Sequence, residues 1–303
     1  MSPPNASRVL EDLSLVIPTL GRPILEESLR AIEAGRRWPA RVIVVDQGRR
    51  PEVAGWLAGM AERGIATEYL PSHERGRARG VNRGIERVRT RFLAITDDDC
   101  IADTEWLARL IEVLRADPDC AATGRVEASG DEVVASVVTA DEPRVTSRPS
   151  LRFDPLSGGN MGTSFAVFER VGLLDEDPVM RCAEDGEWAY RALRAGVRLR
   201  YAPDAIVSHV GWRGYEERVE QYRTYARSQG AFYGKYLARA DAFIALRLLA
   251  HELRALRRWL RGRVRRDAEA AMIGRAYATG LLPGCWQGLR STAPPPPRLA
   301  HPH

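Results

Sequence analysis

The chain has 303 residues, 45% apolar and 28% charged, which is enough for one large or two modest globular domains with a sizeable core. Its apolar runs are far shorter than the roughly 20 residues that cross a bilayer. The first residues carry no secretory pattern, so we expect a cytoplasmic protein. The four cysteines form no CxxC pair, which disfavours a zinc ribbon or a disulfide scaffold. The net charge of +5 is uneven: 17 basic and 7 acidic residues follow position 212, so the last third is strongly basic.

Apolar, β-branched segments alternate with helical segments through the first hundred residues. The predicted strands are Leu13–Pro18, Arg41–Asp46, Thr67–Leu70 and Arg91–Thr96, and the predicted helices are Pro23–Ala34, Pro51–Arg63 and Gly76–Arg89. Strands that are apolar throughout, rather than alternating, indicate a parallel sheet covered by helices on both faces. Ligands of such sheets bind at the carboxyl ends of the strands, so the residues there are the candidate site.

The second half of the chain is less regular. Residues 131–158 lack periodicity and are expected to form a loop. Later strands are predicted at Gly162–Phe168 and Val197–Ala202, with a helix at Glu184–Ala195 between them. From Tyr215 the pattern is almost wholly helical. We therefore expect an α/β domain over residues 1–212, a basic helical region over 213–290 and a disordered proline-rich tail over 291–303.

Three adjacent aspartates, Asp97, Asp98 and Asp99, follow the fourth predicted strand. Carboxylates this close repel each other, and their hard oxygens suit a magnesium or manganese ion. On an extended segment Asp97 and Asp99 would face one way and Asp98 the other. The alternative is a solvated acidic turn that caps a helix starting near Asp103. His209, after a later strand, is a candidate third ligand, although lone histidines are more often structural.

Other candidate residues lie at the remaining strand ends and helix starts. Asp46 ends the second strand and either contacts a nucleobase or ribose or closes a turn. The segment Gly76–Gly84 joins glycines, arginines and a helix start, which favours an anion, but it lacks the GxGxxG dinucleotide spacing. Glu184 and Asp185 open a helix as caps or, beside a diphosphate, as a general base. Gly158–Gly162 offers backbone donors.

Together these segments resemble the family-2 glycosyltransferases, inverting enzymes of GT-A fold, over about residues 13–212. The resemblance rests on six motifs in family order: Val16-Ile17-Pro18-Thr19, Val44-Val45-Asp46, Gly76–Gly84 with Asn82, Asp97–Asp99, Gly159-Asn160-Met161 with Val171–Glu176, and Glu184-Asp185. The chain departs from the family pattern at Gln47, Val81 and Cys100, which leaves the identity of the nucleotide open.

The resemblance implies a mostly parallel, Rossmann-like sheet and transfer of a sugar from a nucleotide-diphosphate donor to an acceptor hydroxyl, assisted by magnesium or manganese. Asp185 is then the general base, with Glu184 supporting it. Asp99 is the metal ligand, to which we add His209. The expected nucleotide-sugar contacts are Pro18, Thr19, Asp46, Arg79, Asn82, Asp97 and Asp98, and the expected acceptor-side residues are Gly159, Asn160, Met161 and Trp188. The acceptor, whether glycan, lipid-linked or small molecule, stays open.

The basic C-terminal third contains two long predicted helices. Tyr215–Tyr236 is aromatic and either borders the acceptor site or packs in the core. Ala242–Arg266 carries arginines around an apolar stripe that consists of Phe243, Leu246, Leu249, Leu253, Leu256, Leu260 and Val264. Such a helix suits the anionic inner face of a membrane as a peripheral contact. The alternative is a helix packed on its own domain with a solvated arginine face.

Three rival functions are weaker. A nucleotidyltransferase of similar fold would need a glycine-rich, lysine-bearing loop after the first strand, where the chain has Pro18–Pro23. A catalytically silent nucleotide-sugar-binding protein would not need the intact aspartates or the Glu184-Asp185 pair. Nucleic acid is not an expected partner, because no interleaved aromatic and basic strand pattern and no known binding module is present.

Overall fold

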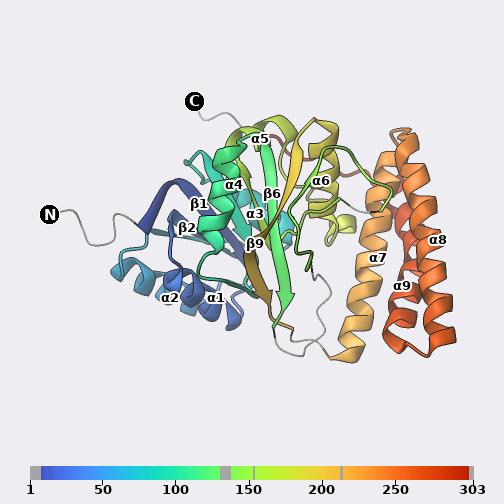
Figure 1. Cartoon of the computed structure of the whole chain (residues 1–303), viewed down its shortest axis with the longest axis horizontal. Coiled ribbons are helices and arrows are strands. Elements are labelled where there is room, and N and C mark those ends of the chain that lie inside the picture. The colour runs from blue at the N-terminus through green and yellow to red at the C-terminus, as the bar shows by residue number, and fades with distance from the viewer. Residues whose placement is uncertain (1–7, 130–137, 153, 212–213, 300–303) are drawn as a thin grey trace.

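The computed structural model describes residues 8–129, 138–152, 154–211 and 214–299 (Figure 1). Within these residues one mixed sheet has the strand order β3-β2-β1-β4-β8-β6-β9-β5, with β7 paired to β9 off this path. The strands are Val9–Thr19 (β1), Trp38–Asp46 (β2), Thr67–Pro71 (β3), Phe92–Thr96 (β4), Cys100–Ala102 (β5), Cys120–Ala128 (β6), Arg144–Thr146 (β7), Asn160–Ser164 (β8) and Arg198–His209 (β9).

Helices cover the sheet and form the C-terminal region. They are Ile24–Ala34 (α1), Pro51–Glu62 (α2), Arg77–Ile85 (α3), Trp106–Ala116 (α4), Phe165–Val171 (α5), Glu184–Arg194 (α6), Tyr215–Leu237 (α7), Ala242–Arg265 (α8) and Ala268–Leu289 (α9), with a 3₁₀ turn at Pro178–Met180. No helix in the described part of the chain is both long and apolar enough to span a membrane.

The β1-to-β4 half of the sheet has the predicted parallel arrangement. β1 pairs in parallel with β2 and β4, and β2 with β3. Alternate residues of these strands enter two separate cores: Leu15 and Val42 pack with α1, α2 and α4, whereas Val16 and Ile43 pack with α3 and α6. Burial on both faces explains the continuous apolar runs at Val42–Val45 in β2 and Phe92–Ile95 in β4.

The other half of the sheet is mixed and departs from the prediction. β8 runs antiparallel to both β4 and β6, and the segment from Phe165 is helix α5 rather than the end of a strand over Gly162–Phe168. A short apolar run does not distinguish a strand from a buried helix by periodicity, which accounts for the error. The expected loop over 131–158 contains β7, and its residues 131–137 and 153 lie outside the described ranges.

The three C-terminal helices form a bundle at the edge of the molecule, with α8 outermost (Figure 1). Glycines let α7 and α9 approach closely: a Cβ atom at Gly284 would lie 2.0 Å from the carbonyl oxygen of Arg227. Buried polar contacts join α7 to the sheet domain, where Lys235 Nζ lies 2.6 Å from Asp175 Oδ2 and Tyr236 donates to Glu187 over 2.6 Å. The helical region therefore packs as a continuation of the α/β domain.

Residues 291–299 do not form the expected disordered tail. The amide of Leu173 donates to the carbonyl of Pro297 over 2.9 Å, and Leu299 packs against the core under α3 and α6. Prolines lower the conformational entropy that a segment loses on docking, so a proline-rich stretch can lie ordered on a surface without helix or strand. Residues 300–303 lie outside the described ranges.

Candidate active site

Two adjoining cavities of about 340 Å³ each lie where β1, β2 and β4 end. The first cavity is lined by residues from these strand ends, including Pro18, Thr19, Gln47 and Asp97–Asp99. The second is lined by Gly158, Gly159, Glu184 and Asp185, with Tyr277 from α9. Arg77, Asp97, His209 and Tyr225 border both cavities, so the two are parts of one site. The site thus lies at the sheet edge that the strand pattern predicts.

The three aspartates form a tight turn rather than an extended segment. The amide of Cys100 donates back to the carbonyl of Asp97 over 3.2 Å. Arg22 therefore reaches both Asp98 and Asp99, the latter at 3.0 Å, which corrects the expectation that Asp98 faces away from its neighbour. Burial raises the pKa of Asp98 even though Arg22 opposes this shift. Arg22 was not among the predicted site residues, because its only signal in the sequence is its place shortly after the first strand.

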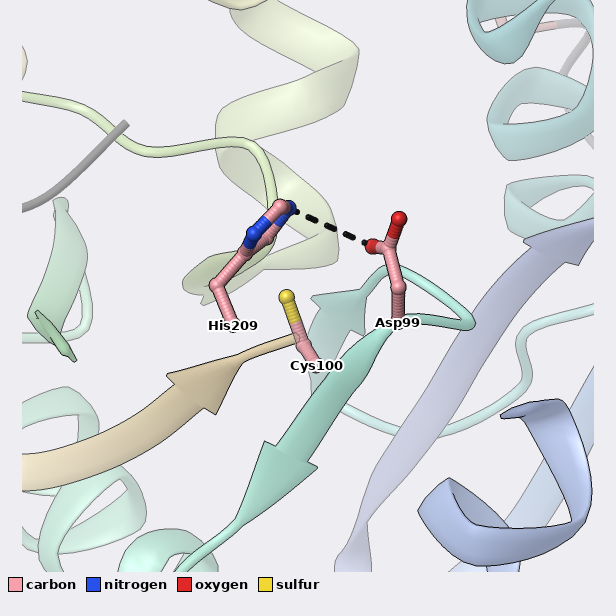
Figure 2. Close-up of side chains that lie close together, drawn as sticks. All are labelled: Asp99, Cys100 and His209. Carbon is pink, nitrogen blue, oxygen red and sulfur yellow. Dashed lines mark ion pairs between the residues drawn. The ribbon is translucent and has the colours of Figure 1, made fainter. Parts of the chain in front are cut away.

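Asp99, Cys100 and His209 come together because β5 pairs with β9, with Cys100 opposite His209. Their ligand atoms all lie within 4.8 Å of one another, and Figure 2 shows the ring of His209 turned toward Asp99, with 3.4 Å between Nε2 and Oδ1. Burial keeps the pKa of the Cys100 thiol well above its usual range, so the sulfur stays protonated. The carboxylate and imidazole remain as donors, a set that fits a hard divalent cation.

Arg77 is the second residue that the sequence analysis missed. Its Nε donates to Asp97 over 2.7 Å and its Nη1 to Glu184 over 3.2 Å. Its Nη2 and the Oε2 atom of Glu184 are buried without a partner among the described residues. Burial raises the pKa of Glu184 to about 7, although Arg77 opposes the shift. The Gly76–Gly84 motif pointed to this region, but the family resemblance singled out Arg79 instead.

Asp185 opens α6 beside these residues and faces the second cavity. Its Oδ2 accepts from the amide of Gly158 over 3.1 Å, and its Oδ1 from the amide of Gly186 over 2.7 Å. Gly159 lies against the acidic turn, where a Cβ atom would be 2.9 Å from the sulfur of Cys100 and 3.1 Å from Asp97. The predicted base therefore borders the same cavity as His209, one of the two predicted metal ligands, while the other, Asp99, lines the adjoining cavity.

Polar residues at the strand ends near the first cavity either stabilise the neighbouring structure or line the cavity. The hydroxyl of Thr19 donates to Asp98 over 2.6 Å and helps hold the acidic turn. Asp46 is fully buried, and its carboxylate accepts from the amides of residues 48–50 and from the hydroxyl of Tyr69. Gln47 lines the cavity in its place, with its side-chain amide donating to two backbone carbonyls, those of Glu74 and Gly76.

Five other predicted site residues lie away from the two cavities. Asn82 joins α3 to the segment at Leu174, with bonds of 2.9 Å in both directions, and Arg79 faces Glu176 at 3.8 Å. Asn160, Met161 and Trp188 are core residues, each at most 1% exposed. The side-chain amide of Asn160 ties β8 to β6 and β9. In the sequence, a motif that fixes the backbone next to a site cannot be distinguished from a motif whose side chains line the site.

Two of the C-terminal tyrosines border the site. Tyr225 of α7 lines both cavities and accepts from Gln221 over 2.8 Å, and Tyr277 of α9 lines the second. The other aromatic side chains of α7 divide, because Phe232 and Tyr233 are buried in the core and Tyr215 is exposed. Core packing is therefore confirmed for Phe232 and Tyr233, whereas a place at the acceptor site stays a prediction for Tyr225, which lines the candidate site.

Comparison with known proteins identifies the family. The model of glycosyl transferase family 2 matches residues 14–173. The pre-mycofactocin glycosyltransferases of two Mycobacterium tuberculosis strains, CDC 1551 / Oshkosh and ATCC 25618 / H37Rv, are each 28% identical over 232 residues. These cover 74% of this chain but only 46% of the relatives, so the chain spans about half of their length.

Solved structures share the fold at low sequence identity. The mannosyltransferase PcManGT of Pyrobaculum calidifontis, in complex with GDP-Man and Mn²⁺, has a TM-score of 0.62 at 18% identity, over 93% of this chain and 88% of its own. S. aureus TarS 1-349 with UDP-GlcNAc has a TM-score of 0.54 at 13% identity, over 89% of this chain and 92% of its own. With a family model that matches more than half of its length, the chain belongs to glycosyl transferase family 2 and has the GT-A fold.

Proposed function

We propose that this protein transfers a sugar from a nucleotide-diphosphate donor to an acceptor hydroxyl by a single displacement that inverts the sugar carbon. One observation carries the proposal: Asp97 of the acidic turn, His209 and Asp185 border a common cavity, and His209 lies close to Asp99 in the adjoining one. Family membership and the nucleotide sugars bound by PcManGT and TarS support the donor class.

The donor is proposed to bind in the first cavity. Asp97 has one carboxylate oxygen, Oδ1, on Arg77 and lies beside Pro18 and Thr19, where a ribose hydroxyl can be held. Gln47, rather than the enclosed Asp46, faces the space for the base. Asp98, already bonded to Thr19 and Arg22, would act indirectly by fixing the turn.

Asp99 and His209 would hold the divalent cation, and GT-A neighbours with Mn²⁺ support this choice. Such an ion supplies charge neutralisation for a departing diphosphate. Arg22 is close enough to Asp99, at 3.0 Å, to keep the turn in place before the donor arrives. Magnesium and manganese are both compatible with one carboxylate, one imidazole and donor oxygens.

Asp185 is proposed to take the proton from the acceptor hydroxyl. The amides of Gly158 and Gly186 hold its carboxylate at the edge of the second cavity and orient it. Glu184 is buried and accepts from Arg77, so an acceptor hydroxyl reaches the half-buried Asp185 more readily. Burial raises the pKa of Glu184 to about 7, so its charge near neutral pH affects the electrostatic field at Asp185.

The experiment first identifies the donor and then tests the base. A thermal-shift panel of UDP-, GDP- and dTDP-sugars, with and without Mn²⁺, should show one donor class that raises the melting temperature in the presence of the metal. Release of nucleoside diphosphate from that donor should then fall about 10²-fold or more in Asp185→Asn, while the thermal shift persists.

Asp119→Asn is the matched control, because Asp119 is exposed at the start of β6 and lines neither cavity. It should release the nucleotide at the wild-type rate. Normal release by Asp185→Asn would exclude it as the base. A donor-dependent thermal shift without release in the wild-type protein would favour the catalytically silent nucleotide-sugar binder.

A further inference from the structure

The apolar stripe of α8 faces outward. Six of its side chains have exposed fractions between 39% and 84%: Leu246, Leu249, Leu253, Leu256, Leu260 and Val264. The opposite side of the helix, at Ile244, Ala255 and Gly262, is the buried one. A Cβ atom at Gly262 would lie 2.4 Å from the backbone nitrogen of Ala271 in α9, so this side is closely packed. We call the six exposed side chains the α8 stripe.

The α8 stripe is a continuous feature. A helix turns once in 3.6 residues, so side chains spaced by three or four positions stay on one face. In Figure 1, α8 is the outermost helix of the bundle, with α9 and α7 between it and the sheet. Single exposed leucines are normal on a protein surface, whereas a row of six along one helix marks an interaction surface.

Uncompensated positive charge surrounds the α8 stripe. Six exposed arginines on or next to the helix form no ion pair with a carboxylate in the described chain: Arg257, Arg258, Arg261, Arg263, Arg265 and Arg266. By helical geometry Arg257 and Arg261 flank one side of the stripe and Arg263 the other. Glu252 is the single acidic residue between Ala242 and Arg266. A partner of this surface must therefore provide both an apolar environment for the leucines and negative charge for the arginines.

We propose that the α8 stripe docks on the surface of an anionic lipid bilayer. The helix would lie in the plane of the interface, with its leucines at the acyl boundary and its arginines on lipid phosphates, as basic amphipathic helices do. Its 24 residues, about 36 Å long, offer an extended contact. Docking of α8 on a bilayer determines the location of the protein and does not depend on the sugar-transfer chemistry.

A second copy of the chain is the strongest competing occupant. The alternating three- and four-residue spacing from Leu246 to Leu260 also matches a coiled-coil seam. Pairing two copies along this seam would bring their flanking arginines together, with only Glu252 on each helix to offset the repulsion. Anionic headgroups relieve the same charge, so the arginines favour the bilayer over self-association.

Vesicle sedimentation with the full chain tests the proposal. The protein should pellet with phosphatidylcholine vesicles that contain about 30% phosphatidylglycerol. It should pellet at least about fivefold less with pure phosphatidylcholine or in about 0.5 M NaCl, because salt screens the arginines. Replacing Leu249, Leu253 and Leu260 by Gln should lower binding about tenfold or more. Because these side chains are exposed, the variant should keep the wild-type melting temperature.

Two controls distinguish binding by the α8 stripe from nonspecific binding through any exposed apolar side chain and from binding through overall charge. Val145→Gln removes an equally exposed apolar side chain from β7 and should leave binding unchanged. Arg257→Glu with Arg261→Glu should abolish binding to anionic vesicles, whereas Arg109→Glu, on the exposed side of α4, should lower it only slightly. Equal pelleting by the triple-Gln variant would overturn the proposal. The proposal would also be overturned if light scattering showed a dimer of the wild-type protein and a monomer of the triple-Gln variant.

Discussion

Arg77 is the side chain at which the two cavities meet. It holds Asp97, the expected ribose contact, on one side and Glu184, the neighbour of the proposed base Asp185, on the other. Charge-assisted hydrogen bonds of this kind are each worth about 1.5–3 kcal/mol. Arg77 is therefore placed to set the orientation of both carboxylates at once, and a lysine, with a point charge in place of a planar fork, does not replace it.

We therefore expect Arg77→Lys to weaken donor binding. The lysine reaches one carboxylate instead of two, so the affinity for the nucleoside diphosphate with Mn²⁺ should fall about tenfold, the equivalent of about 1.4 kcal/mol. Isothermal titration measures this directly. Arg83→Lys, an exposed arginine on the same helix, is the matched control and should bind as the wild type does. Unchanged binding by Arg77→Lys would remove its role in holding Asp97.

The raised pKa of Glu184 predicts that the stability of the folded protein depends on pH. Its pKa in the folded protein is about 7, above the ordinary value of 4.5, so the native state holds a proton that the unfolded chain has released. Between these two values the unfolded state binds fewer protons, and stability from this group falls as pH rises. Below about pH 4.5 the contribution is complete, and above about pH 7 it is lost.

Glu184→Gln should remove this dependence. The melting temperature of the variant minus that of the wild type should increase from about pH 5 to about pH 8, because only the wild type has to ionise a buried carboxyl. Thermal melts at several pH values give the comparison, and Arg77 keeps its bond to Asp97 in both proteins. A difference that stays flat across this range would mean that Glu184 ionises as it does in water.

At the scale of elements, backbone contact between α7 and α9 is what fixes the helical bundle. Gly284 of α9 lies against the carbonyl of Arg227, where a Cβ atom would approach to 2.0 Å, whereas Gly55 on the exposed side of α2 has nothing within 4 Å. The first glycine is required by packing and the second is not. The contact matters for the site because Tyr225 and Tyr277, which border the cavities, lie on these two helices.

Alanine at the two glycines should therefore have opposite effects. Gly284→Ala forces the helices apart and should lower the free energy of unfolding by about 1–3 kcal/mol. Gly55→Ala gains helix propensity and should raise it by about 0.5–1 kcal/mol. Urea unfolding of both variants measures the two changes. A Gly284→Ala protein as stable as the wild type would show that the helices can separate without cost.

On the scale of the whole molecule, one buried ion cluster joins three distant parts of the chain. Lys235, the single lysine of the protein, contacts Asp175 and Asp177, at 2.6 Å and 3.1 Å. Ser291, at the start of the C-terminal tail, donates to Asp177 over 2.5 Å. The cluster connects α7 and the tail to the segment between α5 and α6, so the helices and the α/β domain are held as one unit.

Lys235→Met should destabilise the protein strongly. It leaves two aspartates buried beside an apolar side chain, and breaking a buried pair in this way costs about 3–5 kcal/mol. The free energy of unfolding in urea should fall by this amount. Arg239→Met, four residues later on an exposed turn, is the control and should change it by less than about 0.5 kcal/mol. A small loss in Lys235→Met would mean that water reaches the cluster.

The sequence by itself determined the family, the parallel β1-to-β4 half of the sheet and the place of the acidic turn. These depend on local patterns: apolar strands, strand-end polar residues and motif order. The tertiary structure decided which motif residues face the cavities. Asp46, Asn82 and Asn160 use their hydrogen-bonding groups mainly to hold neighbouring backbone. Arg22 and Arg77 instead reach carboxylates that lie between 20 and 107 positions away in the chain. The tertiary structure also decided that the α8 stripe faces outward. Helical periodicity in the sequence shows that one face of a helix is apolar, but it does not show what covers that face.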